Sequence, residues 1–235
     1  MSTQIMQANE VPSDEKWLYR IAGISAIVFV IAYIVIIGLY VPVGKPSGAE
    51  AWLTSMAQNE TLWWAILGIS ILTDFLLVPV ALSLYLVLRT ANKSLMLVAM
   101  AFFGLFVILD LALTWTNYAS LIALSSNYAA VTNDAQKTII VTAALYPASV
   151  VDSNILFVYN SLTLAMGILL TGLVMLKGEF NKSTAYLGLV TGVLGIVAVA
   201  GSFLGFLQSL IILVSVLTTV WVLLVGFRLY RLGRQ

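Results

Sequence analysis

Residues 62–88 read LWWAILGISILTDFLLVPVALSLYLVL, and the short basic link RTANK follows at residues 89–93. A second apolar run begins directly after the link, with SLMLVAMAFFGLFVILDLALTWTN over residues 94–117. Either run is long enough for an α-helix to cross the ~30 Å hydrocarbon core of a bilayer. Because the link has room only for a tight turn, the two runs predict a transmembrane helical hairpin.

Apolar segments of similar length make up most of the remaining chain. The uncharged run 184–227 would be about 66 Å long as one helix, roughly twice the thickness of the hydrocarbon core, so it must turn back. Glycine and serine between residues 201 and 209 mark that turn. The predicted membrane helices are residues 17–41, 62–88, 94 to about 124, 154–176, 184–200 and 207–227.

These segments predict an all-α fold, a polytopic integral membrane bundle of six transmembrane helices. We expect a single transmembrane domain over residues 17–230, between a polar tail at 1–16 and a basic tail at 231–235. With both termini in the cytoplasm, nine of the 11 basic residues fall on the inner side and only Lys45 and Lys137 fall outside. The excess of inner Lys and Arg favours this orientation in a cell (plasma) membrane.

Composition excludes several classes of function. Hydrophobic residues make up 61% of the chain and charged residues 9%, and the net charge of +1 gives no electrostatic basis for binding nucleic acid. Cysteine and histidine are absent, which removes disulfides, Cys/His zinc sites, thiolate nucleophiles and histidine-based triads. No phosphate-binding loop, dinucleotide-binding glycine pattern or serine-hydrolase elbow occurs. We therefore expect no enzyme activity, no resident metal and no cofactor, and the lipid bilayer as the main partner.

Two connections on the outer side are too long to be simple turns. Residues 42–61 contain a short amphipathic helix near 48–57, with Trp52, Leu53 and Met56 on one side. Residues 125–153 contain a second helix, for which Asp134 is the expected N-cap. We expect both segments to lie at the outer interface or to fold back over the bundle, and packing on the lipid surface is the preferred interpretation. The alternative is a lid over a cavity that faces outward.

Two aspartates lie deep in the predicted membrane helices, with no Lys, Arg or His near them in sequence. Asp74 is ~21 Å and Asp110 ~24 Å from the inner end of its helix, by helical rise, so we expect both at similar depth. Asp110, Thr114 and Asn117 share one helix face by their i, i+4, i+7 spacing. Asn160 begins a polar stripe on the 154–176 helix. These five residues form the predicted binding site.

The chemistry of two unpaired carboxyls leaves two interpretations open. In a medium of low dielectric constant they are not expected to be ionised together, which suggests shared protons, a bound cation or a cationic solute. Each of these uses is typical of transport. Alternatively, each carboxyl is protonated and only stabilises helix packing through a hydrogen bond to a neighbouring helix.

The 184–200 helix carries Gly188 and Gly192, a small-x-x-x-small pattern that predicts close packing within the monomer.

The tract 109–137, LDLALTWTNYASLIALSSNYAAVTNDAQK, resembles a prokaryotic family of small polytopic membrane proteins known only as a domain of unknown function. The resemblance implies a multi-span bundle in a prokaryotic cell membrane. It assigns no activity and no catalytic residue.

Overall fold

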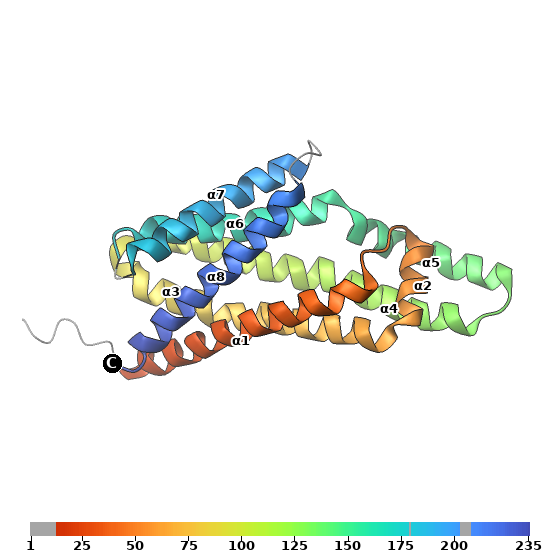
Figure 1. The fold of residues 1–235 in the computed structure, drawn as a ribbon, viewed down its shortest axis with the longest axis horizontal. Helices are drawn as coiled ribbons and strands as arrows, with labels where there is room; N and C mark the ends of the chain where they lie inside the picture. The colour runs from red at the N-terminus through yellow and green to blue at the C-terminus, as the bar shows by residue number, and fades with distance from the viewer. Residues whose placement is uncertain (1–12, 179, 203–207) are drawn as a thin grey trace, which may run out of the picture.

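The computed structural model describes residues 13–178, 180–202 and 208–235, and within these ranges the chain is helical with no strand. Figure 1 shows the helices running mostly along one long axis. In chain order they are α1 (Ser13–Val43), α2 (Ala49–Gln58), α3 (Glu60–Leu109), a π-helical segment (Asp110–Trp115), α4 (Thr116–Ala130), α5 (Asp134–Asp152), α6 (Asn154–Met175), α7 (Lys182–Ser202) and α8 (Gln208–Leu232).

The described residues include five helical stretches that are long and apolar enough to cross a membrane, so the chain has the architecture of a membrane protein. They cover Glu15–Val43, Glu60–Ala130, Asp134–Met175, Lys182–Ser202 and Leu210–Leu232.

Helix α3 consists of two arms that fold back on each other at Asn92. The backbone there leaves helical geometry, with φ −162° and ψ 93°, and the chain reverses direction (Figure 1). The Asn92 side chain accepts a hydrogen bond from the Leu95 backbone N–H at 3.0 Å, which caps the second arm. The hairpin predicted at residues 89–93 is therefore confirmed. The turn predicted near residues 201–209 falls mainly on 203–207, which lie outside the described residues.

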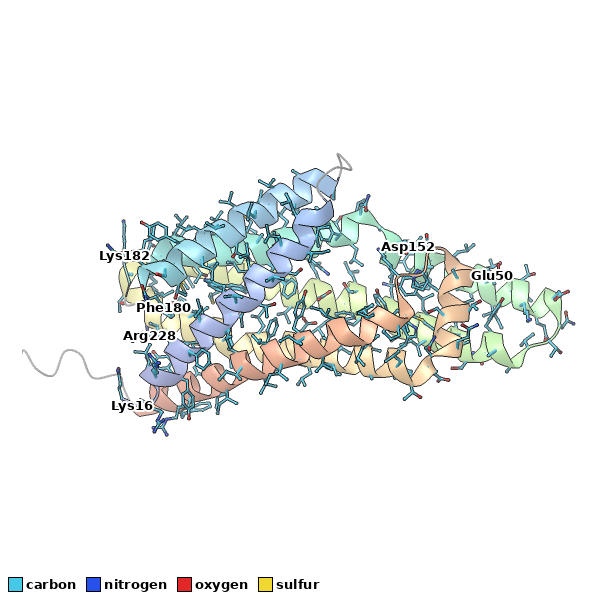
Figure 2. All side chains as sticks on the ribbon, viewed as in Figure 1. Lys16, Glu50, Asp152, Phe180, Lys182 and Arg228 are labelled. Atoms are coloured by element: carbon cyan, nitrogen blue, oxygen red, sulfur yellow. The ribbon has the colours of Figure 1, made fainter. Side chains whose placement is uncertain are left out.

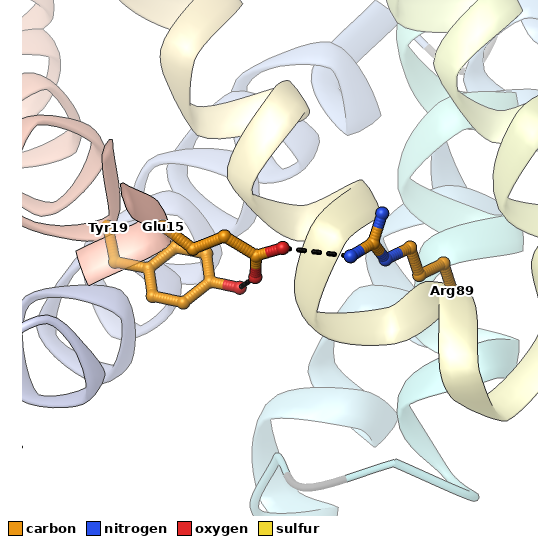
Figure 3. Close-up of polar contacts among 3 residues, drawn as sticks. All are labelled: Glu15, Tyr19 and Arg89. Atoms are coloured by element: carbon orange, nitrogen blue, oxygen red, sulfur yellow. Dashed lines mark hydrogen bonds and ion pairs between the residues drawn. The ribbon is translucent and has the colours of Figure 1, made fainter. Parts of the chain in front are cut away.

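The beginning of α1 and the end of α8 meet at one end of the molecule. The Arg20 guanidinium donates from Nε to the Gly233 carbonyl at 2.6 Å. Glu15 joins this end to the α3 hairpin, because it accepts from Arg89 at 2.8 Å and from the Tyr19 hydroxyl at 2.6 Å (Figure 3). We call this the basic end.

Charged side chains of opposite sign lie toward the two ends of the bundle. Lys16, Lys182 and Arg228 lie at the basic end, whereas Glu50 and Asp152 lie toward the opposite end (Figure 2). The basic residues at the start of α1, the start of α7 and the end of α8, all predicted to lie on one side, thus share an end of the structure.

At the opposite end α2, α4 and α5 form a cap with its own apolar core. Trp52, Leu53 and Met56 of α2 are fully buried in it, against residues of α3, α4 and α5. The carboxylate of Asp152 accepts from the Gly48 N–H at 2.9 Å and the Trp52 indole N–H at 3.0 Å. The preferred prediction of lipid-surface packing is therefore wrong for this face of α2, which folds onto protein.

The ends of several helices differ from the sequence prediction. Helix α1 begins at Ser13 rather than after the predicted tail, and α8 extends to Leu232. The cap of α5 is Asn133, whose side chain accepts from the Ala135 N–H at 2.9 Å, and Asp134 is the first helical residue. Asn133 has the extended backbone that an N-cap requires, with ψ 125°.

Helix α7 packs closely on α6 and α8 through the predicted glycines. A Cβ atom on Gly192 would lie 2.7 Å from the Leu169 Cα, and one on Gly188 would lie 2.6 Å from the Trp221 indole nitrogen. The close approach predicted within the monomer is confirmed.

Candidate functional site

A cavity of about 370 Å³ lies inside the bundle and brings the two membrane aspartates together. Asp74 comes from the first arm of α3 and Asp110 from the π-helical segment. The other walls come from α1, α6, α7 and α8. Its polar lining residues besides the aspartates are Tyr33, Tyr40, Ser70, Thr73, Trp115, Asn160, Ser161, Thr191, Ser215, Thr218 and Thr219.

Asp74 is fixed by an aromatic donor from the neighbouring helix. Its side chain is 3% exposed, and Oδ2 accepts a hydrogen bond from the Trp115 indole N–H at 2.7 Å. No hydrogen bond to the other oxygen, Oδ1, is found among the described residues. One oxygen of this carboxyl thus remains available on the cavity wall.

Asp110 is fixed by two polar neighbours. The Asn160 amide donates to Asp110 Oδ1 at 2.6 Å and to the Thr114 hydroxyl oxygen at 2.8 Å, and the Thr114 hydroxyl also bonds to Asp110. Asn160 therefore ties α6 to the π-helical segment. The side-chain oxygen of Asn160, Oδ1, is buried and has no hydrogen-bond partner among the described residues.

The predicted site residues differ in their relation to the cavity. Asp74, Asp110 and Asn160 line it, and Thr114 stands behind Asn160 and orients its amide. Asn117 is not part of the group, because its amide donates to the Leu113 carbonyl one turn earlier on its own helix, at 2.6 Å.

Trp115 belongs to the site although α-helical periodicity does not place it there. In an α-helix, Asp110 aligns with residues 114 and 117. The chain instead forms a π-helix over Asp110–Trp115, where hydrogen bonds run from i to i+5 and the turn is wider. The wider turn puts Asp110 and Trp115 on the same cavity wall. Such π-helical turns are frequent at functional sites.

The electrostatics of the cavity suit a cation. Its described lining contains two carboxyls and neither Lys nor Arg, and the two carboxyls are close enough to repel each other when ionised. The side-chain oxygen Oδ1 of Asn160, which has no partner among the described residues, adds a further acceptor. No cluster of three or more acidic, Cys or His side chains suited to a metal ion occurs among the described residues.

Most of the cavity wall is apolar or aromatic. Aromatic side chains from several elements face it: Phe29, Tyr33, Tyr40, Phe106, Trp115 and Phe157. Aromatic faces attract organic cations, whereas a hydrated metal ion needs several oxygen ligands. The arrangement therefore suits an organic ammonium group better than an inorganic ion.

Comparison with known proteins gives a family but no activity. A family model described as "Domain of unknown function (DUF4386)" matches residues 21–233. The resemblance seen in the 109–137 tract is thereby confirmed. No curated protein and no solved structure shows a significant match.

Proposed function

The chain belongs to this family of unknown function, and we propose that it is a transporter-like membrane protein that binds a small cationic solute through Asp74 and Asp110. One observation carries the proposal: two carboxyls line a single cavity whose described lining has no basic residue. A cation bound there would neutralise them, and intramembrane carboxyls commonly mark ion or substrate paths.

The acceptor groups around the site support binding of an ammonium ion. Two oxygen acceptors are without a described hydrogen bond, Asp74 Oδ1 and the side-chain oxygen Oδ1 of Asn160. The Asp110 carboxyl, which accepts from Asn160, is a third acceptor group in the same cavity. A primary ammonium has three N–H donors. Protons and small inorganic cations are less favoured candidates for the same carboxyls, since neither makes use of the aromatic wall.

The proposal includes a topology. The two arms of α3, the second continued by α4, together with α1, α6, α7 and α8, would make six membrane crossings. Both termini would be cytoplasmic, because the basic end holds the starts of α1 and α7 and the end of α8. In the cap, α2, α5 and the last part of α4 would then lie outside a prokaryotic plasma membrane. We propose no enzyme activity, no cofactor and no nucleic-acid partner.

A second candidate is an accessory or sensor protein whose aspartates only hold the helices together. The observation in its favour is that each carboxyl already accepts a hydrogen bond from another helical segment, from Trp115 or from Asn160. A protonated carboxyl with such a hydrogen bond can hold two helices together without binding any ligand.

Replacing Asp74 or Asp110 with Asn separates the two candidates. Asn keeps the shape of the carboxyl and one of its two acceptor oxygens and removes its charge, so we expect hexylammonium affinity to fall at least ~10-fold, about 1.4 kcal/mol. The control is Asp134→Asn, which changes an exposed acid on α5 outside the cavity. The measurements are binding to protein in nanodiscs, uptake into liposomes and the melting temperature Tm.

Lost binding with an unchanged Tm in both cavity variants supports the proposal. Unchanged binding and uptake together with a lowered Tm would show that the aspartates are structural. Sodium and proton uptake are measured in the same liposomes. If the wild type does not bind hexylammonium, but takes up sodium or protons only when both carboxyls are present, that ion is the ligand instead.

A further inference from the structure

The cavity is elongated along the bundle. On α6 its lining runs from Phe157 to Ile168, and on α1 from Phe29 to Tyr40. Each interval is about eleven residues, or ~16 Å of helix. The carboxyls therefore occupy only part of its length.

Contacts between α6 and α7 locate the other end. The two helices are antiparallel, with Gly195 against Ala165 and Gly192 against Leu169. Thr191 is the residue before Gly192. Because Gly192 packs on Leu169, Thr191 lies at about the same level along the bundle as Leu169. That level is about nine residues from Asn160, or ~14 Å nearer the basic end.

Thr191 differs from Thr163, Thr171 and Thr219 on the helices around it. Its side chain is 1% exposed and lines the cavity, yet Oγ1 has no hydrogen-bond partner among the described residues. The hydroxyls of Thr163, Thr171 and Thr219 each donate to a carbonyl of the preceding turn, at 2.7–2.8 Å. A buried hydroxyl without a partner lowers stability, so a ligand group that paired with Thr191 would be favoured.

Helix α8 adds hydroxyls at the same level. Gly188 packs on Trp221 and Gly195 approaches Val214, which aligns Thr191 with Thr218 across the α7–α8 contact. Thr218 and Ser215 also line the cavity. Between this hydroxyl cluster and the carboxyls the wall is apolar, with Leu164, Ala165 and Ile168.

We propose that the ligand is an elongated organic amine with a second hydrogen-bonding group at its far end. Its ammonium lies against Asp74 and Asp110, its apolar chain runs along α6, and its far polar group pairs with the Thr191 hydroxyl. This inference rests on the proposed function, since it assumes that the carboxyls hold the cationic end.

The test compares hexylamine with aminohexanol, which carries amino and hydroxyl groups at opposite ends. In the wild type we expect aminohexanol to bind about three- to tenfold more tightly, the effect of one hydrogen bond. Thr191→Val is expected to abolish that preference and to leave hexylamine affinity unchanged. The variant should keep or raise Tm, because valine replaces a hydroxyl that has no described partner in the free protein.

The control is Thr171→Val on α6. Thr171 is fully buried, bonds to the Gly167 carbonyl and does not line the cavity, so its loss should not alter the preference for aminohexanol. Equal binding of both amines to the wild type, or an equal loss for both in Thr191→Val, would overturn the inference. Asp110→Asn is the separate check: if it weakens neither amine, the proposed function itself fails.

Discussion

Replacing Trp52 with Ala is expected to lower the free energy of unfolding by about 3–5 kcal/mol, the range for deleting a large buried aromatic side chain. Trp52 is 0% exposed and is the central ring of the cap. Its indole packs edge-on against Trp63 and Tyr118, with ring centroids 5.5 and 5.4 Å away. Alanine would remove these contacts and leave the Asp152 carboxylate without its indole donor.

Unfolding in mixed micelles with increasing SDS measures this loss. The control is Trp64→Ala, because Trp64 is 47% exposed and its removal leaves no comparable cavity. Trp52→Phe separates the two contributions in part, since it loses the bond to Asp152 but keeps a packed ring and leaves a much smaller cavity than alanine. We expect Trp52→Phe to cost about 1–3 kcal/mol. A Trp52→Ala variant as stable as Trp64→Ala would show that α2 does not hold the cap together.

The hairpin and the long apolar helices follow directly from the sequence, because their determinants are local. A run of apolar residues long enough to cross a bilayer, followed by the polar link RTANK and a second such run, has few possible structures other than a helical hairpin. The reversal at Asn92 occurs inside that link. The close approach of α7 is likewise visible in the spacing of Gly188 and Gly192, since small residues at this spacing let helix axes come near.

The position of α2 depends on contacts that a local pattern does not contain. An apolar stripe of Trp52, Leu53 and Met56 fits a lipid surface and a protein surface equally well. The choice is made by Asp152, roughly a hundred residues later in the chain, whose carboxylate binds the beginning of α2 and the Trp52 indole. Nothing in residues 42–61 alone points to that partner.

Part of the site can be predicted from the sequence, and the missing part has one physical cause. Buried carboxyls are conspicuous in an apolar segment, which identifies Asp74 and Asp110, and the polar stripe identifies Asn160. A periodicity of 3.6 residues per turn omits Trp115 and includes Asn117. The π-helix over Asp110–Trp115 breaks that periodicity at this point. No feature of the sequence DLALTW distinguishes it from an ordinary helical turn.

Gly23→Ala is expected to destabilise the protein by about 3 kcal/mol, the upper part of the range for overpacking. Gly23 lies where α1 crosses α8, and a Cβ there would lie 2.5 Å from the Tyr230 Cβ and 2.8 Å from its Cα. The obstacle is partly backbone, so no change of rotamer relieves it. The two helices would have to separate, and they also meet closely where Gly226 faces Ala26.

Gly38→Ala is the matched control, because it is the same substitution in the same helix. Gly38 is exposed, and a Cβ added there would have no atom within 4 Å, so alanine should gain about 0.5–1 kcal/mol from its higher helix propensity. SDS titration of both variants measures the difference. If both variants shift equally, the α1–α8 crossing does not hold the first and last helices together. A loss confined to Gly23→Ala shows that this crossing closes the bundle, and with it the wall of the cavity that α1 and α8 share.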